Sequence, residues 1–305
     1  MLQVELAGLK LRNPLILASG ILGSSASLAL RVEEAGAGAY TTKTITRDPR
    51  PGYLNPSFID LGIGYLNAIG LANPGIDDFA EELDLMKKAV RIPVILSVGG
   101  GSPEEYEYVV KIGAERGADA FELNLSCPHV KGMGAELGED LDVALEIIRR
   151  ARAASGGRPI FLKLSAHYNY LGLAEEALKA GISGFTAINT LRGLAIDVYA
   201  RAPILSNVYG GYSGPPIKPV ALRVVYELYE NFGKVPIIGV GGVDSWVSAL
   251  EMVLAGASAV GVGSAIAANG FEIFGEIIEG LRKYLETEGF RRITELVGLA
   301  HERSV

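Results

Sequence analysis

The chain has little cysteine and little positive charge. Cys127 is its only cysteine, which excludes an internal disulfide and an iron–sulfur cluster held by this chain alone. Its 28 lysine and arginine residues are outnumbered by 35 aspartate and glutamate residues, for a net charge of -7. Nucleic acid and anionic membranes both require clustered positive charge, so neither is an expected partner.

Membrane, targeting and hydrolase signals are also lacking. Residues 1–5 have neither the basic start nor the apolar run of a signal peptide. No stretch reaches the roughly 18 consecutive apolar residues of a membrane span. We therefore expect a cytoplasmic protein without membrane insertion.

The three histidines show no metal-ligand spacing, and neither H-E-x-x-H nor G-x-S-x-G occurs. No metal site, metallohydrolase or serine hydrolase is predicted.

A repeated strand signal is present instead. Eight short apolar runs alternate with segments of helical period, and their near-continuous apolar character is typical of parallel strands buried on both faces. The predicted strands are residues 15–18, 39–44, 94–98, 120–126, 160–165, 184–190, 237–241 and 259–263. The clearest predicted helices are residues 77–90, 103–116, 141–154, 219–232 and 247–255. At the start of the second helix, Ser102 is a predicted cap and Glu105 completes a predicted capping box.

The order of these elements indicates an α/β fold, with two possible architectures. A (β/α)8 TIM barrel is favoured over a doubly wound open sheet, because residues 18–23 do not form the G-x-G-x-x-G turn that the open sheet would carry. Residues 4–13 predict an N-terminal hairpin that closes one end of the barrel. No linker or low-complexity tract divides the chain, so we expect a single domain, 1–305.

Polar side chains gather where the predicted strands end. Lys43 and Lys163 lie at the ends of buried predicted strands, where an ammonium group is costly unless it faces an anion or a cavity. Either lysine alone could pair with a loop carboxylate, but both together with Asn124 and Asn189 predict a polar pocket at the barrel mouth. The long loops 47–75, 128–140 and 191–219 also follow strand ends, on the face where barrels carry their active sites.

Glycine-rich turns follow the last two strands, at residues 239–242 and 261–264. Glycine lets the backbone approach a ligand closely, and the loops after strands seven and eight are the usual phosphate site of such barrels. The turns therefore predict a phosphorylated cofactor or substrate.

Cys127 has two interpretations. A lone cysteine is usually a small buried hydrophobe, but its place at a strand end before Pro128 also fits a catalytic thiol.

Over these residues, and nearly end to end, the chain resembles the soluble class 1 dihydroorotate dehydrogenases, FMN enzymes of pyrimidine (UMP) biosynthesis. The matching stretches are residues 18–20, 42–44, 67–75, 124–128, 188–190, 210–215 and 217–223. The resemblance implies oxidation of dihydroorotate to orotate: C6 passes hydride to flavin N5, and Cys127 takes the proton from C5 as general base.

The resemblance also implies roles around the two ligands. The FMN phosphate would contact Gly241, Gly242, Gly263 and Ser264. The rest of the cofactor would contact Ser19, Lys43, Thr44, Ser97, Asn124, Lys163, Ile188 and Gly214. Orotate would be held by Lys43, Asn67, Ala68, Ile69, Gly70, Leu71, Asn124, Asn189 and Thr190. Lys163 would be the cation that stabilises reduced flavin.

Two residues depart from the family pattern. Ser97 stands where the family usually has asparagine, and its shorter hydroxyl leaves that flavin contact open. His129 also stands in place of asparagine; it could bind substrate or favour the Cys127 thiolate, or it could be a solvent-facing loop residue.

Three alternatives concern the activity and the electron acceptor. A dihydropyrimidine dehydrogenase would share the fold, FMN and a Cys-Pro-His loop, but its neutral substrate has no carboxylate for Lys43 to meet. A non-catalytic scaffold barrel is disfavoured by the polar residues gathered on one face. Within class 1, one branch is a homodimer that reduces fumarate. In the other, a partner subunit with FAD and an iron–sulfur cluster passes electrons onward, commonly to NAD. Residues 188–223 look closer to the partnered branch, so we expect a homodimer core within a heterotetramer.

Overall fold

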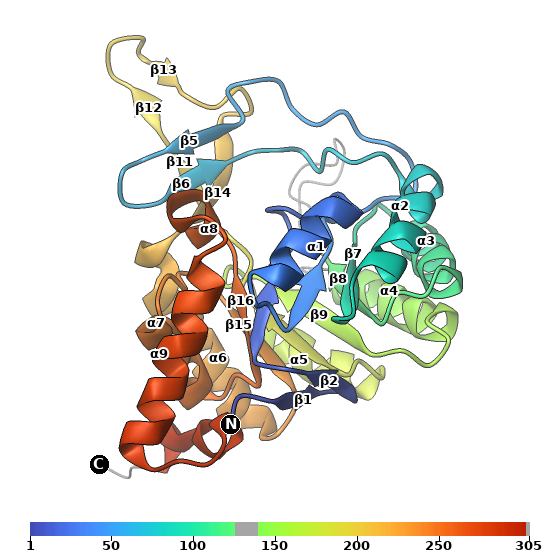
Figure 1. The fold of residues 1–305 in the computed structure, drawn as a ribbon. Helices are drawn as coiled ribbons and strands as arrows, with labels where there is room; N and C mark the ends of the chain where they lie inside the picture. The colour runs from blue at the N-terminus through green and yellow to red at the C-terminus, as the bar shows by residue number, and fades with distance from the viewer. Residues whose placement is uncertain (126–139, 303–305) are drawn as a thin grey trace.

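The computed structural model describes residues 1–125 and 140–302, so Cys127 and His129 lie outside the described residues. The eight predicted strands form one closed parallel barrel (Figure 1). In chain order they are β3 (Leu15–Leu17), β4 (Ala39–Thr41), β7 (Val94–Val98), β8 (Ala120–Asn124), β9 (Ile160–Leu164), β10 (Gly184–Ala187), β15 (Ile237–Val240) and β16 (Ala259–Val262). Each strand pairs with the next, and β16 pairs with β3. The barrel prediction is therefore confirmed, and the open sheet is excluded.

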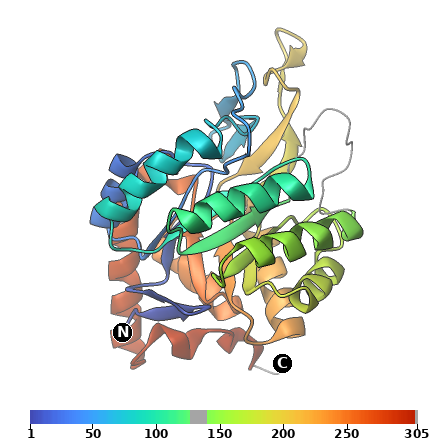
Figure 2. The same ribbon diagram turned by 90° about the vertical axis from the view of Figure 1, so that its right-hand side faces the viewer.

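Helices surround the barrel (Figures 1 and 2). They are α1 (Ala26–Glu34), α2 (Ile76–Ala89), α3 (Pro103–Glu115), α4 (Leu141–Ala154), α5 (Tyr170–Lys179), α6 (Lys218–Phe232), α7 (Trp246–Ala255), α8 (Ala265–Asn269) and α9 (Ile273–Glu288), with short 3-10 segments η2 (Pro215–Ile217), η3 (Ile293–Leu296) and η4 (Leu299–His301). The five predicted helices agree with the structure to within one residue at each end. In the part of the chain that the structure describes, no helix combines the length and the apolar character of a membrane span.

The start of α3 differs from the predicted capping box in one half. The hydroxyl of Ser102 accepts a hydrogen bond from the N–H of Glu105 at 3.4 Å, as expected. The carboxylate of Glu105 accepts from the N–H of Gly101 at 2.8 Å, one residue before the cap. The acid therefore still satisfies a free N–H group at the helix start, but it is not the one that a capping box pairs.

The N-terminal hairpin lies at the barrel end opposite the C-terminal ends of the strands, as predicted. β1 (Val4–Leu6) pairs antiparallel with β2 (Leu9–Leu11). Ala7 and Gly8 turn the chain with φ values of 50° and 88°. Leu6 and Leu11 are buried in the main core. Figure 1 shows the hairpin below the barrel strands, near the N-terminus.

The segments 47–75 and 191–219, expected to be long loops, contain additional strands. β5 (Phe58–Asp60), β6 (Tyr65–Asn67), β11 (Leu191–Leu194) and β14 (Tyr209–Ser213) form an antiparallel sheet in the order β11-β14-β6-β5. We call it the mouth sheet, because it lies over the C-terminal ends of the barrel strands (Figure 1). β12 (Ile196–Asp197) and β13 (Ala202–Pro203) extend beyond it as a two-stranded ribbon. Leu66, Ala68 and Leu205 form a separate small core, against which Ile59 and Tyr212 of this sheet pack.

Candidate active site

A cavity of about 530 Å³ lies between the barrel mouth and the mouth sheet. Among the described residues, every predicted cofactor and substrate residue except Ser97 lines it. These residues are Ser19, Lys43, Thr44, Asn67, Ala68, Ile69, Gly70, Leu71, Asn124, Lys163, Ile188, Asn189, Thr190, Gly214, Gly241, Gly242, Gly263 and Ser264. The fold thus brings together residues from most of the barrel strands and from both segments of the mouth sheet. Cys127 lies outside the described residues.

The cavity lining is positively charged. Lys43, Arg50, Lys163 and Arg192 line it, and no aspartate or glutamate occurs among its described lining residues. Burial lowers the pKa of Lys43, because desolvation disfavours the ammonium form. Such a lining favours an anionic ligand over a neutral one. The two arginines were not predicted; their sequence signal is weak, since both occur in segments interpreted as loops.

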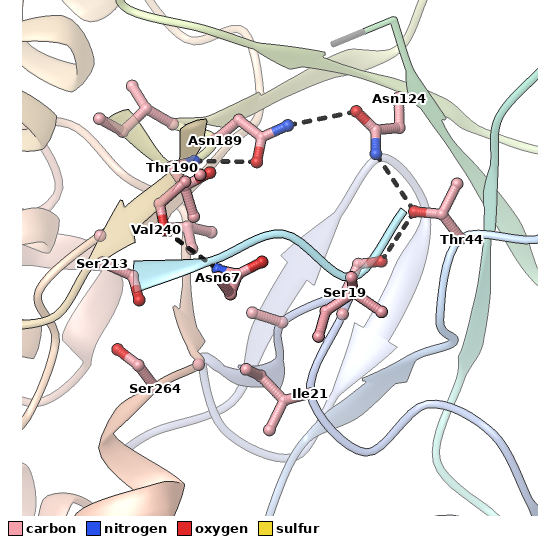
Figure 3. A pocket seen from close by; sticks show the side chains of 18 of the residues that line it. Ser19, Ile21, Thr44, Asn67, Asn124, Asn189, Thr190, Ser213, Val240 and Ser264 are labelled. Atoms are coloured by element: carbon pink, nitrogen blue, oxygen red, sulfur yellow. Dashed lines mark hydrogen bonds between the residues drawn. The ribbon is translucent and has the colours of Figure 1, made fainter. Parts of the chain in front are cut away.

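Two amides on the barrel side are fixed by hydrogen bonds to other lining residues (Figure 3). Asn124 Nδ2 donates to the hydroxyl of Thr44 at 3.2 Å, and Asn189 Nδ2 donates to Asn124 Oδ1 at 3.2 Å. Asn189 Oδ1 accepts from the N–H of Thr190 at 2.8 Å. Each amide has donors and acceptors left over, so the pair can bind a ring that alternates N–H and C=O groups.

The mouth sheet holds a third amide above them. Asn67 Nδ2 donates to the carbonyl oxygen of Gly211 at 3.1 Å, across the pairing of β6 with β14. Gly211 itself leaves no room for a side chain, since a Cβ atom there would lie 2.1 Å from the hydroxyl of Thr190. The glycine therefore lets β14 lie directly against Thr190 at the cavity wall.

Ser97 lies beneath the cavity lining, in a fully buried position. Its hydroxyl is 3.0 Å from the hydroxyl of Thr44, and it donates to Glu122 Oε1 at 2.9 Å. Glu122 also forms an ion pair with Lys163, with 3.6 Å between Oε1 and Nζ. Sequence reasoning missed Glu122, although a single acid inside an apolar strand was a usable signal.

The glycine turns after β15 and β16 fit a phosphate group. Gly241 and Gly242 have φ values of 127° and 72°, a backbone conformation that favours glycine. In the described part of the chain, the N–H groups of Gly242, Gly263 and Ser264 have no hydrogen-bond acceptor. These groups lie at one cavity. Free backbone N–H groups at closely approachable turns are the donors that phosphate oxygens need.

Comparison with known proteins gives one consistent result. Residues 1–285 match the family model described as "Dihydroorotate dehydrogenase". The chain is 47% identical over 304 residues to a Pyrococcus furiosus protein named dihydroorotate dehydrogenase B (NAD(+)), catalytic subunit, and the match covers 99% of each. It is 42% identical over 306 residues to a Methanocaldococcus jannaschii protein of the same name, again with 99% of each covered.

A third relative has a name of the other type. An Aeropyrum pernix protein, provisionally named dihydroorotate dehydrogenase A (fumarate), is 43% identical over 300 residues, which cover 98% of this chain and 97% of that protein. The family model spans most of the chain, and each relative matches it nearly end to end. The chain belongs to the dihydroorotate dehydrogenase family.

Proposed function

We propose that this protein oxidises dihydroorotate to orotate in pyrimidine biosynthesis and transfers the hydride to bound FMN. The observation that carries the proposal is the cavity lined by Lys43, Arg50, Lys163 and Arg192, without a described acidic residue and beside three fixed amides. Dihydroorotate is a carboxylate whose ring alternates N–H and C=O groups, and this lining is complementary to both features. Family membership supplies the reaction class.

FMN dependence is general in this family, and the flavin supplies the hydride-accepting chemistry when it is bound. Gly241, Gly242, Gly263 and Ser264 would hold its phosphate through the free N–H groups. The remaining predicted cofactor contacts are Ser19, Lys43, Thr44, Asn124, Lys163, Ile188 and Gly214. Lys163 is buried and charged within this lining, so it would stabilise negative charge on the reduced ring.

The substrate residues would act by charge and by amide pairing. The ammonium group of Lys43 would pair with the carboxylate of dihydroorotate, which offsets part of the cost of burying that lysine. Asn67, Asn124 and Asn189 would pair with the ring, because each amide offers both a donor and an acceptor. Thr190 would add a hydroxyl at the same wall of the cavity.

Cys127 would remove the proton from C5 as the general base. This role comes from the resemblance of residues 124–128 to the class 1 motif. A thiol with an ordinary pKa of about 8.5 is only roughly 3% thiolate at pH 7. Turnover is therefore expected to rise with pH unless the site lowers that pKa.

Anaerobic mixing of the purified yellow protein with two reductants tests the proposal. Dihydroorotate is expected to bleach the flavin absorbance, and dihydrouracil, which lacks the carboxylate, is expected to leave it nearly unchanged. Bleaching by dihydrouracil but not by dihydroorotate would establish the dihydropyrimidine alternative. A purified protein without flavin absorbance that also fails to bind added FMN would support the scaffold alternative.

The proposal includes a homodimer core and a partner subunit that carries FAD and an iron–sulfur cluster. The relatives named as catalytic subunits of NAD(+)-type enzymes support it. Large apolar side chains near the mouth sheet are also exposed: Leu54 is 82% exposed, Val198 72% and Tyr199 93%. Such a surface favours a protein contact. Turnover with fumarate by this chain alone, with no FAD- or iron-bearing protein co-purifying, would contradict the partnered assignment.

A further inference from the structure

Glu122 is a buried acid below the cavity that none of the roles above uses. It lies in β8, two residues before Asn124, so both side chains point to the inside of the barrel. Its neighbours in register are Ser97 on β7 and Phe161 on β9. Glu122 is 3% exposed and Ser97 0%. The carboxylate therefore sits among protein groups and not in solvent.

The hydrogen bonds above Glu122 can run in only one direction. A carboxylate only accepts, so the Ser97 hydroxyl must donate its single hydrogen to Glu122, at 2.9 Å. The oxygen of Ser97 is then left to accept, and the Thr44 hydroxyl must donate to it, at 3.0 Å. With its own hydrogen used, Thr44 can only accept at its oxygen.

This direction continues to the two barrel-side amides. Thr44 accepts from Nδ2 of Asn124 at 3.2 Å, which turns Oδ1 of that amide toward Asn189. Oδ1 accepts from Asn189 Nδ2 at 3.2 Å. The donor and acceptor pattern that these amides present to the cavity is thus set from two ends: by a carboxylate three hydrogen bonds below Asn124, and by the N–H of Thr190, which donates to Asn189 Oδ1 (Figure 3 shows the upper part).

The same carboxylate is the charge partner of Lys163. Nζ of Lys163 lies 3.6 Å from Oε1 of Glu122, and the lysine is 6% exposed. Among the residues that the structure describes, no other carboxylate lies within 4 Å of this ammonium group. A buried ammonium group without a partner would be strongly unfavourable, so Glu122 holds the charge in place at the cavity floor.

We propose that Glu122 is a positioning residue with two effects: together with the N–H of Thr190 it sets the hydrogen-bond polarity of Asn124 and Asn189, and it holds and partly offsets the charge of Lys163. The first effect passes through Ser97, and the second does not. The identity of the ligands that these groups meet rests on the proposed function.

Two variants separate the effects. Glu122→Gln keeps the shape of the side chain but removes its charge, and its amide can donate as well as accept. Ser97→Ala removes the link to Thr44 and leaves the Glu122–Lys163 ion pair intact. Two quantities are measured on each FMN-loaded protein: the orotate dissociation constant, from the flavin absorbance change, and the FMN midpoint potential, from equilibration with a redox dye.

Ser97→Ala is expected to weaken orotate binding about tenfold, because the Thr44 hydroxyl is then free to reverse and Asn124 is held from the Asn189 side alone, with the potential unchanged. Glu122→Gln is expected to shift the potential to more positive values, because the charge of Lys163 is no longer offset beside the flavin. Ser97→Ala should also weaken orotate binding much less in a Glu122→Gln background than in the wild type.

Additive effects on orotate binding would overturn the polarity effect, and an unshifted potential in Glu122→Gln would overturn the charge effect. If Glu122→Gln does not fold, Ser97→Ala alone still tests the first effect: unchanged orotate affinity would refute it. Wild-type protein that dihydroorotate does not reduce would instead refute the proposed function, so the two failures are distinguishable.

Discussion

Replacement of Gly242 by alanine tests whether the turn after β15 is shaped for a phosphate. Gly242 has a φ of 72°, and an alanine in left-handed backbone costs roughly 1–2 kcal/mol. The Cβ atom of the alanine would also lie 2.7 Å from the Cβ atom of Lys218 and 2.9 Å from the backbone nitrogen of Lys218. That nitrogen belongs to the first residue of α6, and the Lys218 side chain is tied to Glu251 by an ion pair. The turn must therefore move, because the helix start cannot easily yield.

Gly289→Ala is the matched control. Gly289 caps α9 with a φ of 78°, and no atom lies within 4 Å of the position its Cβ would take. It carries the backbone cost alone, roughly 1–2 kcal/mol, which lowers the melting temperature by about 2–8 °C. Gly242→Ala carries that cost and the displacement of N–H groups predicted to bind phosphate. We expect it to weaken FMN binding at least about tenfold, equivalent to about 1.4 kcal/mol.

The assay is titration of FMN into deflavinated protein, with thermal unfolding measured on both apoproteins. Gly289→Ala is expected to bind FMN as the wild type does. Equal FMN affinities in the two variants would refute the phosphate assignment. A Gly242→Ala protein as stable as Gly289→Ala would refute the steric argument.

The remaining predictions concern the base, the substrate cation and Asn13, between the hairpin and β3. Cys127→Ser should keep FMN and orotate binding and lose most turnover at neutral pH in steady-state assays; unchanged turnover would remove Cys127 from the mechanism. Burial lowers the pKa of Lys43, so the cationic form is lost at a lower pH than for an exposed lysine. Orotate affinity, measured against pH in the Cys127→Ser background, should therefore fall as pH rises through that pKa. Lys43→Arg in the same background should remove this dependence, because arginine stays charged. An orotate affinity that does not change with pH while Lys43 is present would contradict the pairing of Lys43 with the carboxylate. Asn13→Ala should cost about 2–3 kcal/mol in denaturant unfolding with FMN content unchanged, because buried Asn13 accepts from the N–H of Leu15 and donates to the carbonyl of Gly36. An unshifted unfolding midpoint would show that these bonds do not stabilise the fold.

The barrel was predictable because its signals are local. A strand buried on both faces is apolar at nearly every position, and capping residues mark the ends of a helix in the sequence. The strand ends were less predictable. Residues 39–44 were predicted as one strand, but β4 ends at Thr41, and Lys43 donates its N–H to Gly23 at 2.8 Å. The choice between a strand partner and a loop partner depends on tertiary contacts that periodicity does not encode.

The mouth sheet could not be predicted in the same way. Its strands are short, β14 contains Gly210 and Gly211, and β6 pairs with a segment more than a hundred residues away, as Asn67 does with Gly211. When only the neighbouring sequence is considered, glycine favours the prediction of a turn over that of a strand. Since Arg50 and Arg192 belong to the segments that build this sheet, their place at the cavity could not be predicted either.

The cationic side chains of the cavity come from the barrel and from the segments of the mouth sheet, and salt screens the two groups to different degrees. Lys163 lies in β9 and is buried, and Lys43 follows the end of β4 and is half-buried, so both would interact more strongly with a bound anion, and be screened less by salt, than an exposed residue. Arg192 comes from the mouth sheet and is exposed, so salt screens it and its main effect falls on the approach of an anion. Lys43 and Lys163, which could be predicted from their place at strand ends, would therefore act mainly on the affinity for the bound ligand. Arg50 and Arg192, whose place only the folded chain reveals, would act on entry, because on a protein of net charge -7 they add positive charge at the mouth that would attract an anionic substrate.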